Sequence, residues 1–282
     1  MDYKTIYSKY SKTINEDLNL VEDKNNKNLT NPNNIKKDRT NSHHTKNIKN
    51  VLLIYTGGTF GMCKTENGYK PRKDFLFEYM KNHPVLCDQQ YTLKHTNKDF
   101  NKEGFLTTPS SEICNRVNYK IYEFENAIDS SNMNMNYWIK IGNSIKSHYD
   151  DYDSFIVIHG TDTLAYTACI LSFMLENLNK LVIVTGAQIP LIEMRNDSLK
   201  NLVDSLIIAG NYYIPEVCIF FNSKLMRGNR TIKDDNINLD AFHSPNFSNL
   251  IELGVTAKVR WDLILEPPIE NFNLFNVSNN YV

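Results

Sequence analysis

The stretch VLLIYTGGT at residues 51–59 is an apolar run that ends in a turn rich in threonine and glycine. Three similar apolar runs follow, at residues 154–158, 181–184 and 217–221. Short runs rich in β-branched and aromatic residues are typical of strands buried on both faces. We therefore expect these four segments to be strands at the centre of a sheet.

Helical patterns lie between these runs. Residues 136–149 precede the second run, residues 164–177 follow it, and residues 197–212 follow the third. Asp197 or Asn196 is a suitable N-cap for the last of these helices. Strands that alternate with helices predict an α/β fold, in which helices flank a largely parallel sheet.

Bulk composition is that of a globular protein in water. The 282 residues are 41% hydrophobic and 22% charged, and the formal net charge of -1 gives no strong field for nucleic acid or an anionic membrane. We see no signal-peptide pattern and no apolar run long enough to span a bilayer. The five scattered cysteines suit a reducing compartment and offer no zinc framework. We expect a cytoplasmic protein with no nucleic-acid or membrane partner.

The chain divides by composition into three parts. Residues 1–49 are rich in asparagine and lysine and poor in apolar residues, so we expect a disordered extension. A basic arm for RNA, or an organelle address, is the alternative. Residues 50–245 carry the α/β pattern and the candidate catalytic residues. Residues 246–282 are too few for a second full domain, and we expect an interdomain linker and the remnant of a C-terminal domain there.

Polar turns follow three of the expected strands, where ligands bind in such sheets. These turns read TGGTFG at 56–61, HGTDT at 159–163 and TGAQIP at 185–190. Glycine lets the backbone approach a ligand closely, and a threonine hydroxyl becomes a nucleophile when a base is near. Each turn alone is an ordinary feature of a strand end or a helix start. Together they indicate a catalytic site.

The sequence resembles the bacterial-type L-asparaginase family, specifically its cytosolic type I branch, over residues from about 50 to about 260. The two signatures that match are YTGGTFG at 55–61 and HGTDTLAY at 159–166. Further type I-like stretches are LSFMLENL at 171–178, VIVTGAQIP at 182–190 and RGNRTIK at 227–233. The resemblance implies the N-terminal α/β domain of that family. It also implies hydrolysis of L-asparagine to L-aspartate and ammonia, without metal or organic cofactor.

The resemblance further implies roles for single residues. Thr59 matches the nucleophile that forms an acyl-enzyme, and Tyr69 matches the mobile-loop tyrosine that hydrogen-bonds it. Thr161, Asp162 and Lys233 match a second catalytic triad, whereas His159 is structural. The residues expected to bind the substrate are Gly58, Asp129, Ser130, Ser131, Thr161, Asp162 and Ala187.

Elementary chemistry supports these roles. A threonine hydroxyl needs a proton acceptor, and Lys233 could serve if its surroundings lowered its pKa. Asparagine is a zwitterion, so Asp162 can pair with its ammonium group. The Ser130 hydroxyl and the backbone amides of Gly58 and Ser131 can donate to its carboxylate. In the family, the carbonyl of Ala187 faces the leaving amide.

The chain also departs from the family pattern. Members usually have a second α/β domain of more than a hundred residues and form active sites between subunits, but this sequence ends about twenty residues after Trp261. We expect a truncated C-terminal domain, and a homodimer or homotetramer if the full domain is present. The alternative functions are a glutaminase, an amidotransferase subunit, or a catalytically impaired asparagine-binding fragment.

Overall fold

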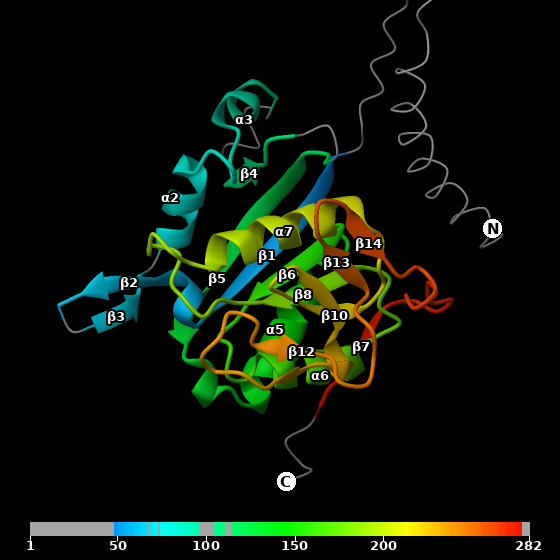
Figure 1. Ribbon diagram of the computed structural model, residues 1–282. Helices are drawn as coiled ribbons and strands as arrows, with labels where there is room; N and C mark the ends of the chain where they lie inside the picture. The colour runs from blue at the N-terminus through cyan, green and yellow to red at the C-terminus, as the bar shows by residue number, and fades with distance from the viewer. Residues whose placement is uncertain (1–47, 67, 73, 96–103, 111–113, 278–282) are drawn as a thin grey trace, which may run out of the picture. The chain divides into compact units, whose positions relative to one another are not determined.

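The computed structural model describes residues 48–66, 68–72, 74–95, 104–110 and 114–277 (Figure 1). The expected disordered extension at 1–49 lies outside these residues, except for its last two positions. The described residues all belong to one compact unit.

Five parallel strands form the centre of a nine-stranded sheet, in the order β9-β8-β6-β1-β5. The four apolar runs all form strands of this group, which confirms the largely parallel sheet. The strand that the apolar pattern did not indicate is β5. The bounds are β1 Lys49–Gly57, β5 Val117–Ile128, β6 Ser154–Ile158, β8 Leu181–Thr185 and β9 Val217–Phe221.

Antiparallel strands complete both edges of the sheet. Strand β4 (Phe105–Thr107) pairs with β5. On the other side β10 (Lys224–Arg227) pairs with β9, followed by β13 (Ile251–Leu253) and β14 (Ala257–Val259). The sheet therefore continues beyond residue 245, where the composition had suggested that the domain ends.

Helices cover both faces because side chains along each strand alternate between two buried clusters. Leu53 of β1 packs with α7 (Ser198–Asn211), whereas Leu52 packs with α5 (Met135–Ser147) and α6 (Leu164–Met174). Figure 1 shows α7 crossing in front of β1. These are the three helices that the sequence predicts. The strands are buried in the two core clusters, which hold the strand ends in place.

The end of one helix differs from the prediction, and the start of another selects one of the two predicted caps. Helix α6 stops at Met174, because the next two residues form β7 (Leu175–Glu176) and pair with β15 (Asn273–Leu274). At the start of α7, the Asn196 side chain accepts a hydrogen bond from the Leu199 amide at 3.0 Å. Asn196 is therefore the residue whose side chain caps this helix.

No helix in the described chain is long and apolar enough to cross a membrane. The five cysteines all lie in the described part of the chain and form no disulfide bond. The short elements are η2 Thr59–Gly61, β2 Met62–Thr65, β3 Gly68–Pro71, α2 Phe75–Asn82, α3 Gln89–His95, η3 Ser130–Asn132, η4 Gly228–Arg230, β11 Ile232–Lys233 and β12 Phe242–His243.

The turns after β1 and β6 pack against each other through two glycines. A Cβ atom on Gly58 would lie 2.4 Å from the Cα atom of Gly160, and one on Gly160 would lie 2.5 Å from Ser130 Oγ. Gly58 also has a φ of 80°, which side chains other than glycine's rarely adopt. This contact places the residues that follow each glycine, Thr59 and Thr161, on neighbouring turns.

We predict that Gly58→Ala lowers the free energy of unfolding by about 2–5 kcal/mol, because it adds overpacking to the strain of a positive φ. Gly68→Ala is the matched control, since Gly68 has a φ of 91° but nothing within 4 Å of an added Cβ. That substitution should cost only about 1–2 kcal/mol. Urea unfolding measures both, and equal losses would contradict close packing at Gly58.

Candidate active site

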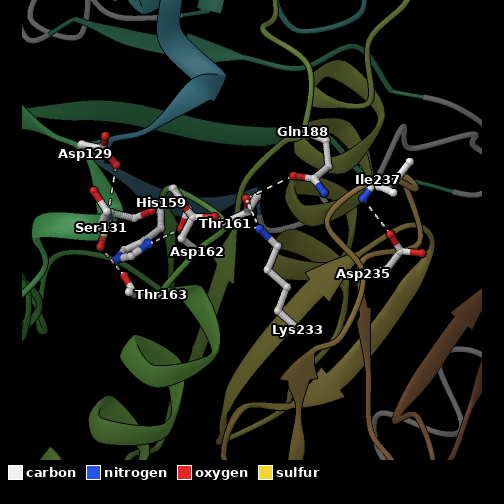
Figure 2. A network of polar contacts seen from close by, with 12 residues as sticks. Asp129, Ser131, His159, Thr161, Asp162, Thr163, Gln188, Lys233, Asp235 and Ile237 are labelled. Carbon is white, nitrogen blue, oxygen red and sulfur yellow. Dashed lines mark hydrogen bonds and ion pairs between the residues drawn. The ribbon is translucent and has the colours of Figure 1, made fainter.

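Lys233 joins the two residues that follow β6. Its Nζ atom donates to Thr161 Oγ1 at 2.9 Å and to Asp162 Oδ1 at 2.9 Å (Figure 2). Lys233 reaches them from the small β11–β12 sheet, whose strands pair through Lys233 and Phe242. Its side chain is 11% exposed, whereas that of Asp162 is 62% exposed. The structure thus assembles the three residues of the expected second triad.

Gln188 also contacts this group of residues, and the sequence analysis did not identify it as a site residue. Lys233 has only donors, so the Thr161 oxygen accepts from it, and the Thr161 proton is directed to Gln188 Oε1 at 3.1 Å. The Gln188 backbone amide donates to Asp197 at 3.0 Å, which fixes the loop. Gln188 therefore sets the direction of the Thr161 proton. Its place in the TGAQIP turn, at a strand end, is the signal that could have found it.

Thr59 is the first residue of η2 and is half-buried. Within the described part of the chain, its hydroxyl forms no hydrogen bond. The turn itself is held firmly, since Gly58 N donates to Ile128 O at 3.1 Å and Leu191 N donates to Phe60 O at 3.1 Å. Thr59 is thus a fixed residue with an unengaged hydroxyl.

The loop at 129–131 lies against the same turns. Ser130 is 2% exposed, and its carbonyl accepts from Thr163 Oγ1 at 2.7 Å. Asp129 accepts from the Ser131 amide at 3.0 Å. The backbone amides of Gly58 and Ser131, expected as substrate donors, therefore already have acceptors within the chain. The Ser130 hydroxyl has no hydrogen bond among the described residues.

The remaining two expected site residues are placed differently. Ala187 is 1% exposed, and Asn201 holds the residue before it through a bond to the Gly186 carbonyl at 3.1 Å. Tyr69 lies on β3 and is 42% exposed. Its hydroxyl donates to the Glu193 carboxylate, not to Thr59.

His159 belongs to a buried chain of hydrogen bonds. Its Nδ1 donates to the Gly160 carbonyl at 2.7 Å, so its Nε2 accepts from Thr167 at 2.9 Å. Trp138 in turn donates to Thr167 at 2.9 Å. Complete burial lowers the pKa of His159 to about 4. A neutral, fully engaged histidine is a support for the Gly160 turn, as the sequence analysis expected.

The arrangement suits acyl transfer by a hydroxyl. It provides an unengaged threonine, a lysine bonded to a second threonine, and an exposed carboxylate for a cationic group. Across the described residues, no three His, Cys, Asp or Glu side chains are grouped so that they could hold a metal ion.

We predict that the stability that depends on neutral His159 is lost on acidification. The unfolded pKa is about 6.5, so this contribution is complete above about pH 6.5 and falls towards pH 4, by about 3 kcal/mol at most. Urea midpoints at pH 7.5, 6 and 5 measure the decline. His159→Asn should show a shallower decline than the wild type, and an unchanged decline would exclude His159 as its source.

Comparisons with known proteins agree with this geometry. A family profile described as "Asparaginase, N-terminal" matches residues 50–265. An L-asparaginase of Dirofilaria immitis is 45% identical over 218 residues, covering 77% of this chain and 37% of that protein. L-asparaginase 1 of Escherichia coli K12 is 44% identical over 207 residues, covering 73% of this chain and 54% of that protein.

A solved structure shows the same relationship. L-asparaginase I from Vibrio cholerae superposes with a TM-score of 0.65 at 36% identity, covering 80% of this chain and 61% of that one. The chain thus spans between about a third and three fifths of the length of these relatives. By the extent of the profile match and the shared fold, this chain belongs to the asparaginase family.

Proposed function

We propose that the chain hydrolyses the side-chain amide of L-asparagine to L-aspartate and ammonia, with Thr59 as the nucleophile. The position of Lys233 is the main support for this proposal. Lys233 contacts both Thr161 and Asp162, on the turn that packs against the turn of Thr59. The site thereby combines a nucleophile, a proton acceptor and a fixed anion.

Recognition of the substrate rests on its opposite charges. One Asp162 oxygen is bonded to Lys233, and the exposed carboxylate leaves the other oxygen for the α-ammonium group. The unengaged Ser130 hydroxyl donates to the α-carboxylate, with Asp129, Ser131 and Gly58 shaping the loop around it. Because the amides of Gly58 and Ser131 are engaged, Ser130 is the main donor in this proposal.

In the reaction, Thr59 Oγ1 attacks the amide carbon, its proton passes by way of the proton acceptor to the departing nitrogen, and the carbon–nitrogen bond breaks to release ammonia. Water then attacks the acyl carbon, one of its protons returns to Thr59 Oγ1, and aspartate leaves. Backbone amides near Thr59 and Thr161 stabilise the oxyanion, and the Ala187 carbonyl accepts from the leaving amide. Tyr69 assists Thr59, and no metal or organic cofactor takes part.

Lys233 and the substrate share one carboxylate in this proposal. Lys233 donates to Thr161 and to one oxygen of Asp162. An α-ammonium group bound to the other oxygen of Asp162 therefore brings the substrate close to the proposed proton acceptor.

We also propose a cellular compartment, an oligomeric state and a preferred substrate. We place the protein in the cytoplasm, as a homodimer or homotetramer when it carries a full second domain. L-asparagine is the proposed substrate, and L-glutamine is the competing amide to compare in every assay.

We predict that Thr59→Ala lowers the rate of ammonia release from asparagine by about 10⁴-fold or more, since no other group supplies the acylated hydroxyl. A coupled ammonia assay on the purified full chain measures this rate, and circular dichroism checks that the variant is folded. Equal rates for wild type and variant would contradict the proposed nucleophile.

We predict that Lys233→Met lowers kcat by about 10²-fold or more, because it removes the proton acceptor. Lys224→Met is the matched control, since Lys224 also pairs with an aspartate, Asp240, at 2.7 Å but has no contact with Thr161. That control should retain wild-type kcat. A similar loss in both variants would argue for a general effect of lysine removal.

A further inference from the structure

Three side chains form a row of hydrogen bonds that ends at the turn of Thr161. Trp138 of α5 donates through Nε1 to Thr167 Oγ1 at 2.9 Å, and Thr167 of α6 contacts His159 Nε2 at 2.9 Å. His159, directly after β6, contacts the Gly160 carbonyl through Nδ1 at 2.7 Å. Two helices and the sheet are therefore joined to one peptide group, the group between Gly160 and Thr161.

The chemistry of these groups allows only one direction of donation. A carbonyl can only accept, so His159 carries its proton on Nδ1, and its Nε2 atom accepts from Thr167. The indole of Trp138 can only donate, so it uses a lone pair of the Thr167 oxygen. Complete burial lowers the pKa of His159 to about 4, so the ring is neutral at pH 7, as this pattern requires. Every donor in the row thus points towards Gly160.

The last hydrogen bond fixes the orientation of a peptide group. A trans peptide is planar, and its carbonyl and N–H groups point in opposite directions. Because the Gly160 carbonyl points to the buried ring of His159, the N–H group of Thr161 points away from that ring. In the part of the chain that the structure describes, this N–H group forms no hydrogen bond, whereas the amides of Gly58 and Ser131 are engaged. It is therefore a backbone donor that remains for a ligand.

We propose that Trp138 and Thr167 are positioning residues, which act through His159 to direct the N–H group of Thr161 at the oxyanion of the reaction. This inference rests on the proposed function, in which backbone amides stabilise that oxyanion. Such a donor is effective when its direction is fixed before the charge develops. In this proposal Trp138 and Thr167 touch neither the substrate nor the nucleophile, and the row of hydrogen bonds is their route to the reaction.

The direction of the row can be measured without turnover. Nitrogen-15 NMR of the histidine side chains at pH 7 distinguishes the two neutral tautomers, and His159→Asn identifies the signal of His159. We expect the tautomer with its proton on Nδ1. A proton on Nε2, or a charged ring at pH 7, would overturn the inference, because His159 could not then accept from Thr167.

Two substitutions of Thr167 separate hydrogen bonding from packing. Thr167→Val keeps the shape of the side chain but cannot donate to His159, whereas Thr167→Ser keeps the hydroxyl and loses a methyl group. We expect Thr167→Val to lower kcat by about 10-fold or more with little change in KM, and Thr167→Ser to stay within about 3-fold of wild type. The reverse order would show that Thr167 acts by packing, and would overturn the inference.

Ser154→Ala is the control for the loss of a buried hydroxyl. Ser154 lies at the start of β6, is 2% exposed, and donates to the Ala209 carbonyl at 2.9 Å. Its substitution should lower the stability to urea, as that of Thr167 by valine should, but leave kcat unchanged. An equal fall of kcat in both variants would contradict a specific route from Thr167 to the site.

Trp138→Phe tests the first link, because phenylalanine keeps an aromatic ring but has no N–H group. We expect this variant to lower kcat, and we expect the double variant with Thr167→Val to be no slower than Thr167→Val alone. Additive losses would overturn the inference, since Trp138 would then act independently of Thr167.

The outcomes separate the two proposals. If the wild-type chain releases ammonia and Thr167→Val is as fast, the inference is overturned and the proposed function stands. A wild-type chain without turnover contradicts the proposed function, and the role of Trp138 and Thr167 in the reaction is lost with it.

Discussion

The close approach of Gly58 and Gly160 is the constraint on which the candidate site depends. Strands β1 and β6 are neighbours and parallel, so their carboxyl ends meet at one edge of the sheet. A side chain on Gly58 would push the two turns apart, and one on Gly160 would clash with Ser130. Because neither has one, Thr59 and Thr161 lie on adjoining turns, and buried His159 supports the second turn through the Gly160 carbonyl. The hydroxyl chemistry thus follows from backbone packing.

The buried polar groups around these turns show which side chains have structural roles. Thr56 and Thr185 donate to the carbonyls of Ile158 and Phe220 on neighbouring strands, at 3.1 and 2.7 Å. Buried polar groups in proteins are almost always paired in this way. Within the described residues, the hydroxyls of Thr59 and Ser130 form no hydrogen bond, and neither does the buried hydroxyl of Tyr55. Thr59 and Ser130 lie beside the contact of Gly58 and Gly160, where an unengaged hydroxyl is suited to bind a ligand.

The sequence predicted the parallel centre of the sheet, because strands buried on both faces are continuously apolar. It did not reveal β5, whose sequence mixes Lys120 and Glu123 with apolar residues, nor the short antiparallel strands near the C-terminus. Motif resemblance grouped Thr161 and Asp162 with Lys233, although their contact depends on the distant β11–β12 sheet. The partners of Tyr69 and of the Gly58 amide could not be predicted, since both depend on loop and strand register, including the irregularity in β1 between Tyr55 and Gly57.

In the proposed reaction Thr59, rather than Thr161, carries the acyl group. Rapid acid quenching of the full chain during turnover of asparagine, followed by peptide mass spectrometry, tests this directly. We expect an aspartyl adduct on the peptide that contains Thr59, with none on the peptide that contains Thr161. An adduct on Thr161, or steady turnover with no adduct on Thr59 at any quench time, would contradict it.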